Sequence, residues 1–131
     1  MDQQESSSIP IQLSQNCVIA SIQVNLAERI SNTFRQELLD YVHSTGAGGV
    51  ILDVSGLKLM DLDDWNGLRK TMDMVKVIGA VPIIAGLQPG VVVAIIELGA
   101  KTDDVMGVLN TDEAIQLFHK LYKRTSMLDN D

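Results

Sequence analysis

The residues best suited to chemistry in this sequence are three aspartates within the run Asp-Leu-Asp-Asp at residues 61–64. Neighbouring carboxylates can divide the roles of acid and base, and they can bind a hard cation. After Lys58, however, the loop offers no histidine, lysine or arginine to support such a site. Aspartates are also favoured where a helix begins, because they cap it and complement its dipole. We therefore interpret Asp61, Asp63 and Asp64 as a helix start, with an acid–base or metal-dependent enzyme as the minor alternative.

The remaining candidate motifs are weaker. The segment Gly86-Leu-Gln-Pro-Gly90 matches neither phosphate-binding glycine pattern, so it indicates a tight turn with close backbone approach. The single cysteine, Cys17, lies in an apolar run without a basic neighbour, which is typical of a buried structural thiol. His43 and His119 are too far apart in the sequence to form a metal-ligand spacing. We predict no catalytic residues, no metal and no cofactor.

Trp65 is the only tryptophan, and it directly follows the acidic run. A tryptophan at a helix start can belong to the core. It can equally serve as an exposed anchor, because tryptophan is enriched where protein partners bind. The sequence does not decide between these two interpretations.

Composition narrows the class of protein. The chain has 131 residues and a net charge of −7, which argues against a nucleic-acid-binding surface. The small basic cluster of Lys120, Lys123 and Arg124 is typical of a solvated helix end. The N-terminus lacks the pattern of a signal peptide, and no apolar run is long enough for a membrane span. With one cysteine and therefore no internal disulfide, we expect a cytoplasmic protein with no membrane span and no nucleic-acid partner.

Hydrophobic periodicity predicts one α/β domain over residues 9–124, between polar and disordered tails at 1–8 and 125–131. The expected order is ββαβαβαβα, a mixed sheet of four or five strands flanked by four helices, which the pattern leaves free to lie on one face or on both. The first two strands form a hairpin through Ser14–Asn16. Glycines end three helices, and Thr111 caps the last. The strands are expected at 9–13, 17–24, 49–54, 81–87 and 105–109, and the helices at 27–44, 64–78, 89–98 and 112–122.

Two segments resemble a known family. The stretch IIAGLQPGVVVAIIELG at residues 83–99 is similar to the region after the fourth strand of STAS domains (sulfate transporter and anti-sigma factor antagonist), and most similar to the RsbS type of the stressosome scaffold. The stretch GVILDVS at 49–55, followed by Met60 and Asp61, resembles the third strand and signalling loop of the same family. The resemblance extends over about residues 9–122 and implies the STAS fold.

The resemblance also implies a function in protein docking. In partner-switching pathways a histidine-kinase-like serine/threonine kinase phosphorylates a Ser or Thr that follows an Asp at the start of the second helix. Here that position is Leu62, which has no hydroxyl, and a second acceptor position of the sensor paralogues falls near Ala94. Ser55 and Thr71 are the nearest hydroxyls. Asp63 and Asp64 imitate a phosphorylated loop only in part, because each carries about one charge.

We therefore predict a non-enzymatic, bacterial scaffold protein of a stressosome-like or partner-switching stress-response system. Its expected partners are sensor-type STAS paralogues, the kinase and other copies of the chain in a homo- or hetero-oligomer. A small-ligand-binding STAS domain, for a nucleotide or lipid and associated with a transporter, is the alternative. The candidate docking residues are Asp61, Leu62, Asp63, Asp64, Trp65, Gln88, Pro89 and Gly90.

Overall fold

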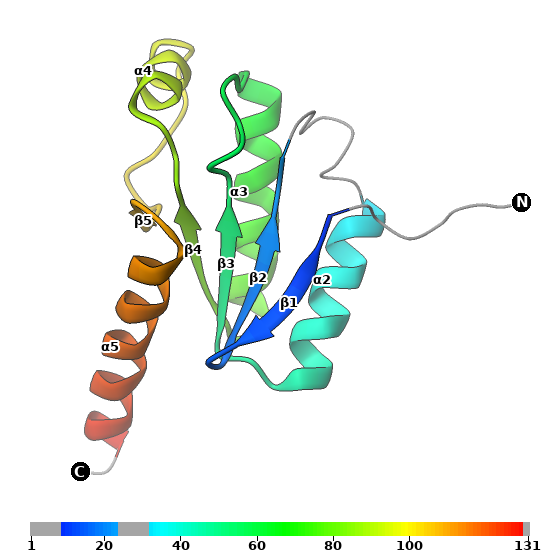
Figure 1. The fold of residues 1–131 in the computed structure, drawn as a ribbon, viewed down its shortest axis with the longest axis vertical. Helices are drawn as coiled ribbons and strands as arrows, with labels where there is room; N and C mark the ends of the chain where they lie inside the picture. Colours follow the sequence, from blue (N-terminus) through cyan, green and yellow to red (C-terminus); the bar gives the residue numbers. More distant parts are fainter. Residues whose placement is uncertain (1–8, 24–31, 130–131) are drawn as a thin grey trace, which may run out of the picture.

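The computed structural model describes residues 9–23 and 32–129, and it has the element order ββαβαβαβα that the sequence predicts (Figure 1). Residues 1–8 and 130–131, and the first part of the helix expected from residue 27, lie outside the described residues. The elements are β1 (Ile11–Ser14), β2 (Cys17–Ser21), α2 (Asn32–Thr45), β3 (Gly49–Asp53), α3 (Leu62–Val77), β4 (Val81–Ala85), α4 (Pro89–Glu97), β5 (Gly107–Val108) and α5 (Thr111–Asp129).

One five-stranded sheet runs in the order β1-β2-β3-β4-β5. The β1–β2 pair is an antiparallel hairpin, and all later neighbours are parallel. The hairpin turns through Gln15 and Asn16, whose φ angles are 52° and 68°. Two consecutive positive φ values suit the right-handed twist of the paired strands, and Asn tolerates them well. The expected hairpin is confirmed, and it places β1 at one edge of the sheet.

Successive residues of the central strands face opposite layers of helices. Val50 and Leu52 of β3 lie in the apolar cluster that α2 and α3 cover, and α4 adds Val91 and Ile95 to that cluster. Ile51, between them, lies in a second cluster covered by α5. The sheet is therefore sandwiched between helices on both faces (Figure 1), which answers the question that the sequence pattern left open.

The α5 layer lies very close to the sheet. A Cβ atom on Gly49 would lie 2.8 Å from the Phe118 ring, and one on Gly48 would lie 2.9 Å from it. Cys17 is fully buried beside them, and burial raises the pKa of its thiol to about 11. A thiol with that pKa is protonated and unreactive at neutral pH. The interpretation of Cys17 as a structural residue is therefore confirmed.

Three boundaries near the chain ends differ from the prediction. Thr111 is the first helical residue of α5, and the preceding residue Asn110 caps the helix, with Oδ1 accepting from the backbone N–H of Glu113 at 2.9 Å. The helix then continues to Asp129, so residues 125–129 are helical and not a disordered tail. The last strand is shorter than expected and comprises only Gly107 and Val108.

The loops after β3 and β4 contact each other at the carboxyl end of the sheet. Gly86 has φ +81°, and a Cβ atom there would lie 2.6 Å from the Cβ of Ser55 and 3.0 Å from its Cα. Gln88 Nε2 donates to the Ser55 carbonyl oxygen at 3.2 Å. The tight turn with close backbone approach that the sequence predicts at Gly86 is therefore present, and it fixes the start of α4 relative to the loop that leads into α3.

This contact predicts that Gly86→Ala destabilises the fold by about 2 kcal/mol or more, because alanine disfavours the positive φ and its methyl group meets backbone atoms. Gly90→Ala is the matched control, since a Cβ there meets nothing within 4 Å and the residue is helical. It should stabilise the protein by about 0.5–1 kcal/mol. Urea unfolding of both variants measures the difference, and equal effects would contradict this account of the turn.

Candidate functional site

The acidic run forms the N-terminus of α3, and Asp61 is the residue that caps it. Its Oδ1 accepts from the backbone N–H of Asp64 at 2.8 Å, while the backbone N–H of Asp61 donates to Asp64 Oδ2 at 3.0 Å. This reciprocal pair is a capping box in which aspartate replaces the more common glutamate. Of the three possible caps, the structure selects Asp61, and α3 begins at Leu62, two residues before the expected start.

Asp64 is placed among like charges by this arrangement. Burial raises the pKa of the Asp64 carboxyl above its ordinary value, and the nearby carboxylates of Asp61 and Asp63 add to the rise. The hydrogen bond from the backbone N–H of Asp61 opposes it. The site therefore holds three neighbouring carboxylates, of which Asp61 and Asp64 cap the helix start while like charges act on Asp64.

Leu62 is the first residue of α3 and is partly buried. It lies on the wall of an open groove of about 450 Å³ between α3 and the chain that follows α4. The position that the family resemblance assigns to the phosphate acceptor therefore lines a surface groove. The other lining residues are Asn66, Arg69, Lys70, Asp73, Gly99, Ala100 and Lys101.

Trp65 belongs to the core, and the proposal that it is an exposed docking anchor is wrong. Its side chain is 1% exposed, and Nε1 donates to the Lys101 carbonyl oxygen at 3.0 Å. One helical turn later, Arg69 donates to the same oxygen at 2.7 Å and forms an ion pair with Asp104 at 2.8 Å. Together the two side chains attach the α4–β5 connection to α3, and Arg69 also lines the groove.

Sequence reasoning missed the part played by Arg69 and Lys101. The only signal was the spacing of Trp65 and Arg69, which places them on one side of a helix. Their shared acceptor lies more than thirty residues away in the sequence. No local pattern identifies a backbone carbonyl as the target, so this contact required the structure.

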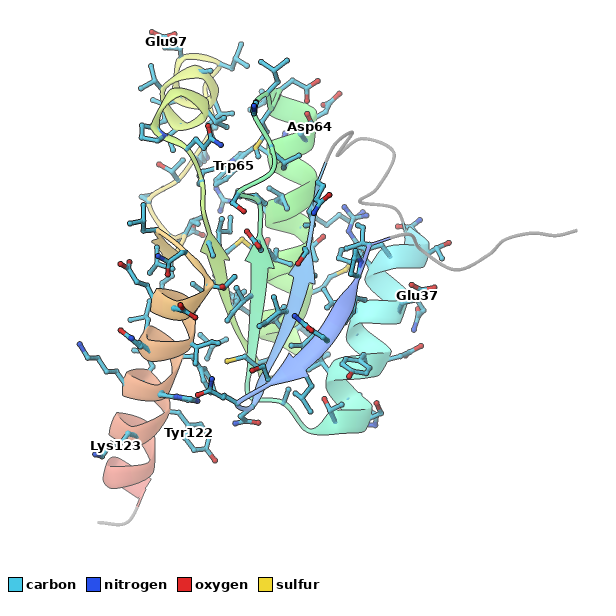
Figure 2. All side chains as sticks on the ribbon, in the orientation of Figure 1. Glu37, Asp64, Trp65, Glu97, Tyr122 and Lys123 are labelled. Carbon is cyan, nitrogen blue, oxygen red and sulfur yellow. The ribbon has the colours of Figure 1, made fainter. Side chains whose placement is uncertain are left out.

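The second group of docking candidates, Gln88, Pro89 and Gly90, is exposed at the start of α4. Gln88 is the N-cap residue of α4, although its side chain makes no capping hydrogen bond and instead reaches the Ser55 carbonyl oxygen. Figure 2 shows α4, with Glu97 labelled, at the same end of the molecule as Asp64. The two groups of candidates therefore lie at one end of the sheet, with Trp65 excluded from the exposed set.

The hydroxyl side chains nearest to Leu62 in the sequence, those of Ser55 and Thr71, differ in accessibility. Thr71 is 1% exposed, accepts from Arg35 Nε at 2.9 Å and donates to the Gly67 carbonyl oxygen at 2.9 Å. A kinase cannot reach it in the folded protein. Ser55 is exposed in the loop that follows β3, and Ala94 is exposed on α4 but has no hydroxyl.

The described residues include no group of three or more His, Cys, Asp or Glu side chains placed to hold a metal ion. Across the same part of the chain, no helix has the length and apolar character that a membrane span requires.

The fold is shared with solved structures that include an RsbS protein and the stressosome. An RsbS variant from Moorella thermoacetica, with a serine replaced by glutamate, matches with a TM-score of 0.77 at 20% identity, covering 89% of this chain and 99% of its own. A structure of the stressosome, described as a signal integration and transduction hub, matches with a TM-score of 0.76 at 20% identity, over 86% of this chain and 98% of that one. Protein TM1081, determined by NMR, has a TM-score of 0.71 at 14% identity and covers 88% of this chain and 92% of its own.

The sequence itself matches no family model, and no curated protein matches it. The structural similarity nevertheless extends over nearly the whole length of each solved chain. It confirms that this protein has the STAS fold of the RsbS type, as the residues at 49–61 and 83–99 led us to expect.

The electrostatics of the helix start predict that Asp64→Asn makes the protein more stable at neutral pH, by no more than about 1 kcal/mol because the group is partly solvated. Because the native pKa is raised, at pH values between the unfolded pKa of Asp and the native pKa the folded state holds a proton on Asp64 that the unfolded state has lost. The stability of the wild type therefore falls as the pH rises from the unfolded pKa of Asp through the higher native pKa. Because asparagine does not titrate, the variant should lack this fall in stability. Its side-chain oxygen can still accept from the backbone N–H of Asp61, so the capping hydrogen bond is kept. Denaturant unfolding at several pH values between about 3 and 7 measures it, and identical pH profiles would contradict the prediction.

Proposed function

We propose that this protein is a non-enzymatic scaffold of a stressosome-like or partner-switching system, acting in the cytoplasm by docking other proteins and other copies of itself. The observation that carries the proposal is the position of Leu62. It occupies the first turn of α3 directly after a capping aspartate, on a fold shared with stressosome proteins, where the family resemblance implies a phosphorylated Ser or Thr. In this proposal the protein retains a docking surface but cannot be phosphorylated at residue 62.

The physical chemistry of the loop supports a fixed state rather than a switched one. A phosphate would add nearly two negative charges and three acceptor oxygens at the helix start. Asp61 and Asp64 already use carboxylate oxygens to cap the backbone N–H groups, so their charge is committed to the helix. Asp63 remains exposed. The surface therefore carries permanent negative charge whose amount no kinase alters at residue 62.

The alternative of small-ligand binding has one supporting observation, the groove of about 450 Å³ with Arg69, Lys70 and Lys101 on its walls. A nucleotide or anionic lipid that bound only the folded state would raise the melting temperature. A panel of such ligands therefore separates the two functions.

Assembly is the direct test of the proposed function. We expect the purified chain to enter a complex with a sensor-type STAS paralogue from the same genome, because a scaffold must bind that class of partner. Size-exclusion chromatography with light scattering, on each protein alone and on the mixture, gives the masses. A chain that remains a monomer alone and in every mixture would overturn the proposal.

Leu62→Ser tests whether the loop keeps the geometry of a kinase substrate. With the cognate kinase and ATP, we expect phosphate incorporation in the variant and none at residue 62 of the wild type, because only the variant has a hydroxyl there. Leu62→Ala is the matched control, since it removes the same side chain without adding an acceptor. Intact mass and peptide mapping give the result. Absence of phosphate on a folded Leu62→Ser variant would mean that the loop has also diverged in shape.

A further inference from the structure

The outward side of α3 carries a regular row of exposed side chains. Asp63, Asn66, Lys70, Asp73 and Val77 recur at three- and four-residue steps, which places them along one stripe of the helix, and all five are exposed. Val77, at the end of the stripe, is 86% exposed. The stripe borders the groove, whose lining includes Asn66, Lys70 and Asp73. This side of α3 is therefore a long accessible surface beside a concave one.

The two charges at the start of the stripe are opposite in sign and too far apart to pair with each other. Asp63 and Lys70 are two turns apart, about 10 Å along the helix axis. Among the described residues, Arg69 forms an ion pair with Asp104, and neither Asp63 nor Lys70 takes part in it. The neutral amide of Asn66 lies between them. An acid, an amide and a base thus follow one another along one side of the helix.

We propose that this stripe is the interface with a second copy of the chain, in which the two α3 helices lie antiparallel about a two-fold axis near Asn66. In that arrangement Asp63 of each copy faces Lys70 of the other, and the interface contains this pair twice. The two Asn66 amides meet at the axis, where each can donate to and accept from the other. The proposal deepens the proposed scaffold function, on which it rests, by naming the surface and the partner.

Charge complementarity is the reason for choosing a second copy as the partner. A two-fold interface must be complementary to itself, so that residue i contacts j and j contacts i. The spacing of Asp63 and Lys70 meets this condition for antiparallel helices, whereas parallel helices would place Asp63 against Asp63. Each copy carries a net charge of −7, so two copies repel at most other contacts. A partner without this reciprocal pattern would leave one of the two charges unmatched.

The same geometry limits the size of the contact. Asp73 lies one turn beyond Lys70 and would approach the capping aspartates of the partner copy, so the favourable overlap ends there. The groove beside the stripe gives the partner helix a concave seat, with Leu62 on its wall. We therefore expect a weak dimer whose formation depends on protein concentration and decreases as salt screens the charges.

Charge reversal tests the proposal. Asp63→Lys and Lys70→Asp should each weaken the dimer about tenfold or more, because each change replaces two attractive pairs with two repulsive ones. The double variant restores both pairs with reversed polarity and should recover the dimer to within about threefold of the wild type. Lys76→Asp is the matched control, since it makes the same charge change on another side of α3 and should have little effect. Sedimentation velocity over a wide range of protein concentration measures the association.

Two additions keep the outcomes distinct. Asp63→Asn removes the attraction without placing a lysine in the first helical turn, and circular dichroism confirms that each variant is folded. Mixing the same variants with a sensor paralogue tests the scaffold function separately from the dimer interface. If every charge-reversal variant still co-assembles with the paralogue, the scaffold function stands and the result bears only on the dimer. The interface is wrong if the wild type never dimerises, if the reversals act like Lys76→Asp, or if the double variant does not recover.

Discussion

Burial of the central parallel strands on both faces is the constraint from which the rest of the structure follows. In β3, the residues from Gly49 to Leu52 are all buried, and their side chains alternate between the α2–α3 layer and the α5 layer. A strand of this kind needs helices on both sides. Parallel connection then places the loops after β3 and β4 at the same end of the sheet, where they contact each other at Ser55 and Gly86. The candidate site lies at this end because the loops that follow parallel strands leave the sheet at the same edge.

The main elements could be predicted because they depend on local chemistry. Continuous apolar runs, glycines with positive φ at Gly46, Gly79 and Gly99, and an Asn-containing hairpin turn all act over a few residues. Side-chain environments depend on distant contacts and were harder to predict. Trp65 is covered by the core and bonded to the Lys101 carbonyl, and Thr71 is buried and bonded to Arg35, so both environments depend on residues far away in the sequence. The continuation of α5 beyond residue 124 also escaped the pattern, because a polar tail and a solvated helix end have similar compositions.

Under the proposed function, the helix start would combine an intact fold with the absence of a phosphorylation switch at residue 62. The Asp61–Asp64 capping box uses side chains on both sides of Leu62, and it needs nothing from residue 62 itself. Leucine at the first position of a helix leaves these capping hydrogen bonds in place and adds apolar surface to the groove wall. Replacement of an acceptor hydroxyl by Leu62 would therefore cost the fold little, while it removes the covalent chemistry completely. The stability of α3 and the capacity for regulation at residue 62 are separable in this arrangement.

The absence of a phosphate acceptor at residue 62 favours use of the exposed stripe of α3 for self-association. A surface that alternates between a neutral and a phosphorylated side chain changes its charge by nearly two units, which would disturb any fixed ion pair beside it. With leucine at position 62, no phosphate can be added there beside Asp63 and Lys70, so a reciprocal pairing between two copies would persist. Arg69 is already occupied by Asp104 and the Lys101 carbonyl, which leaves Lys70 as the cation that the stripe can offer to a partner. A charge pattern that phosphorylation at residue 62 cannot change is suited to a constitutive structural contact.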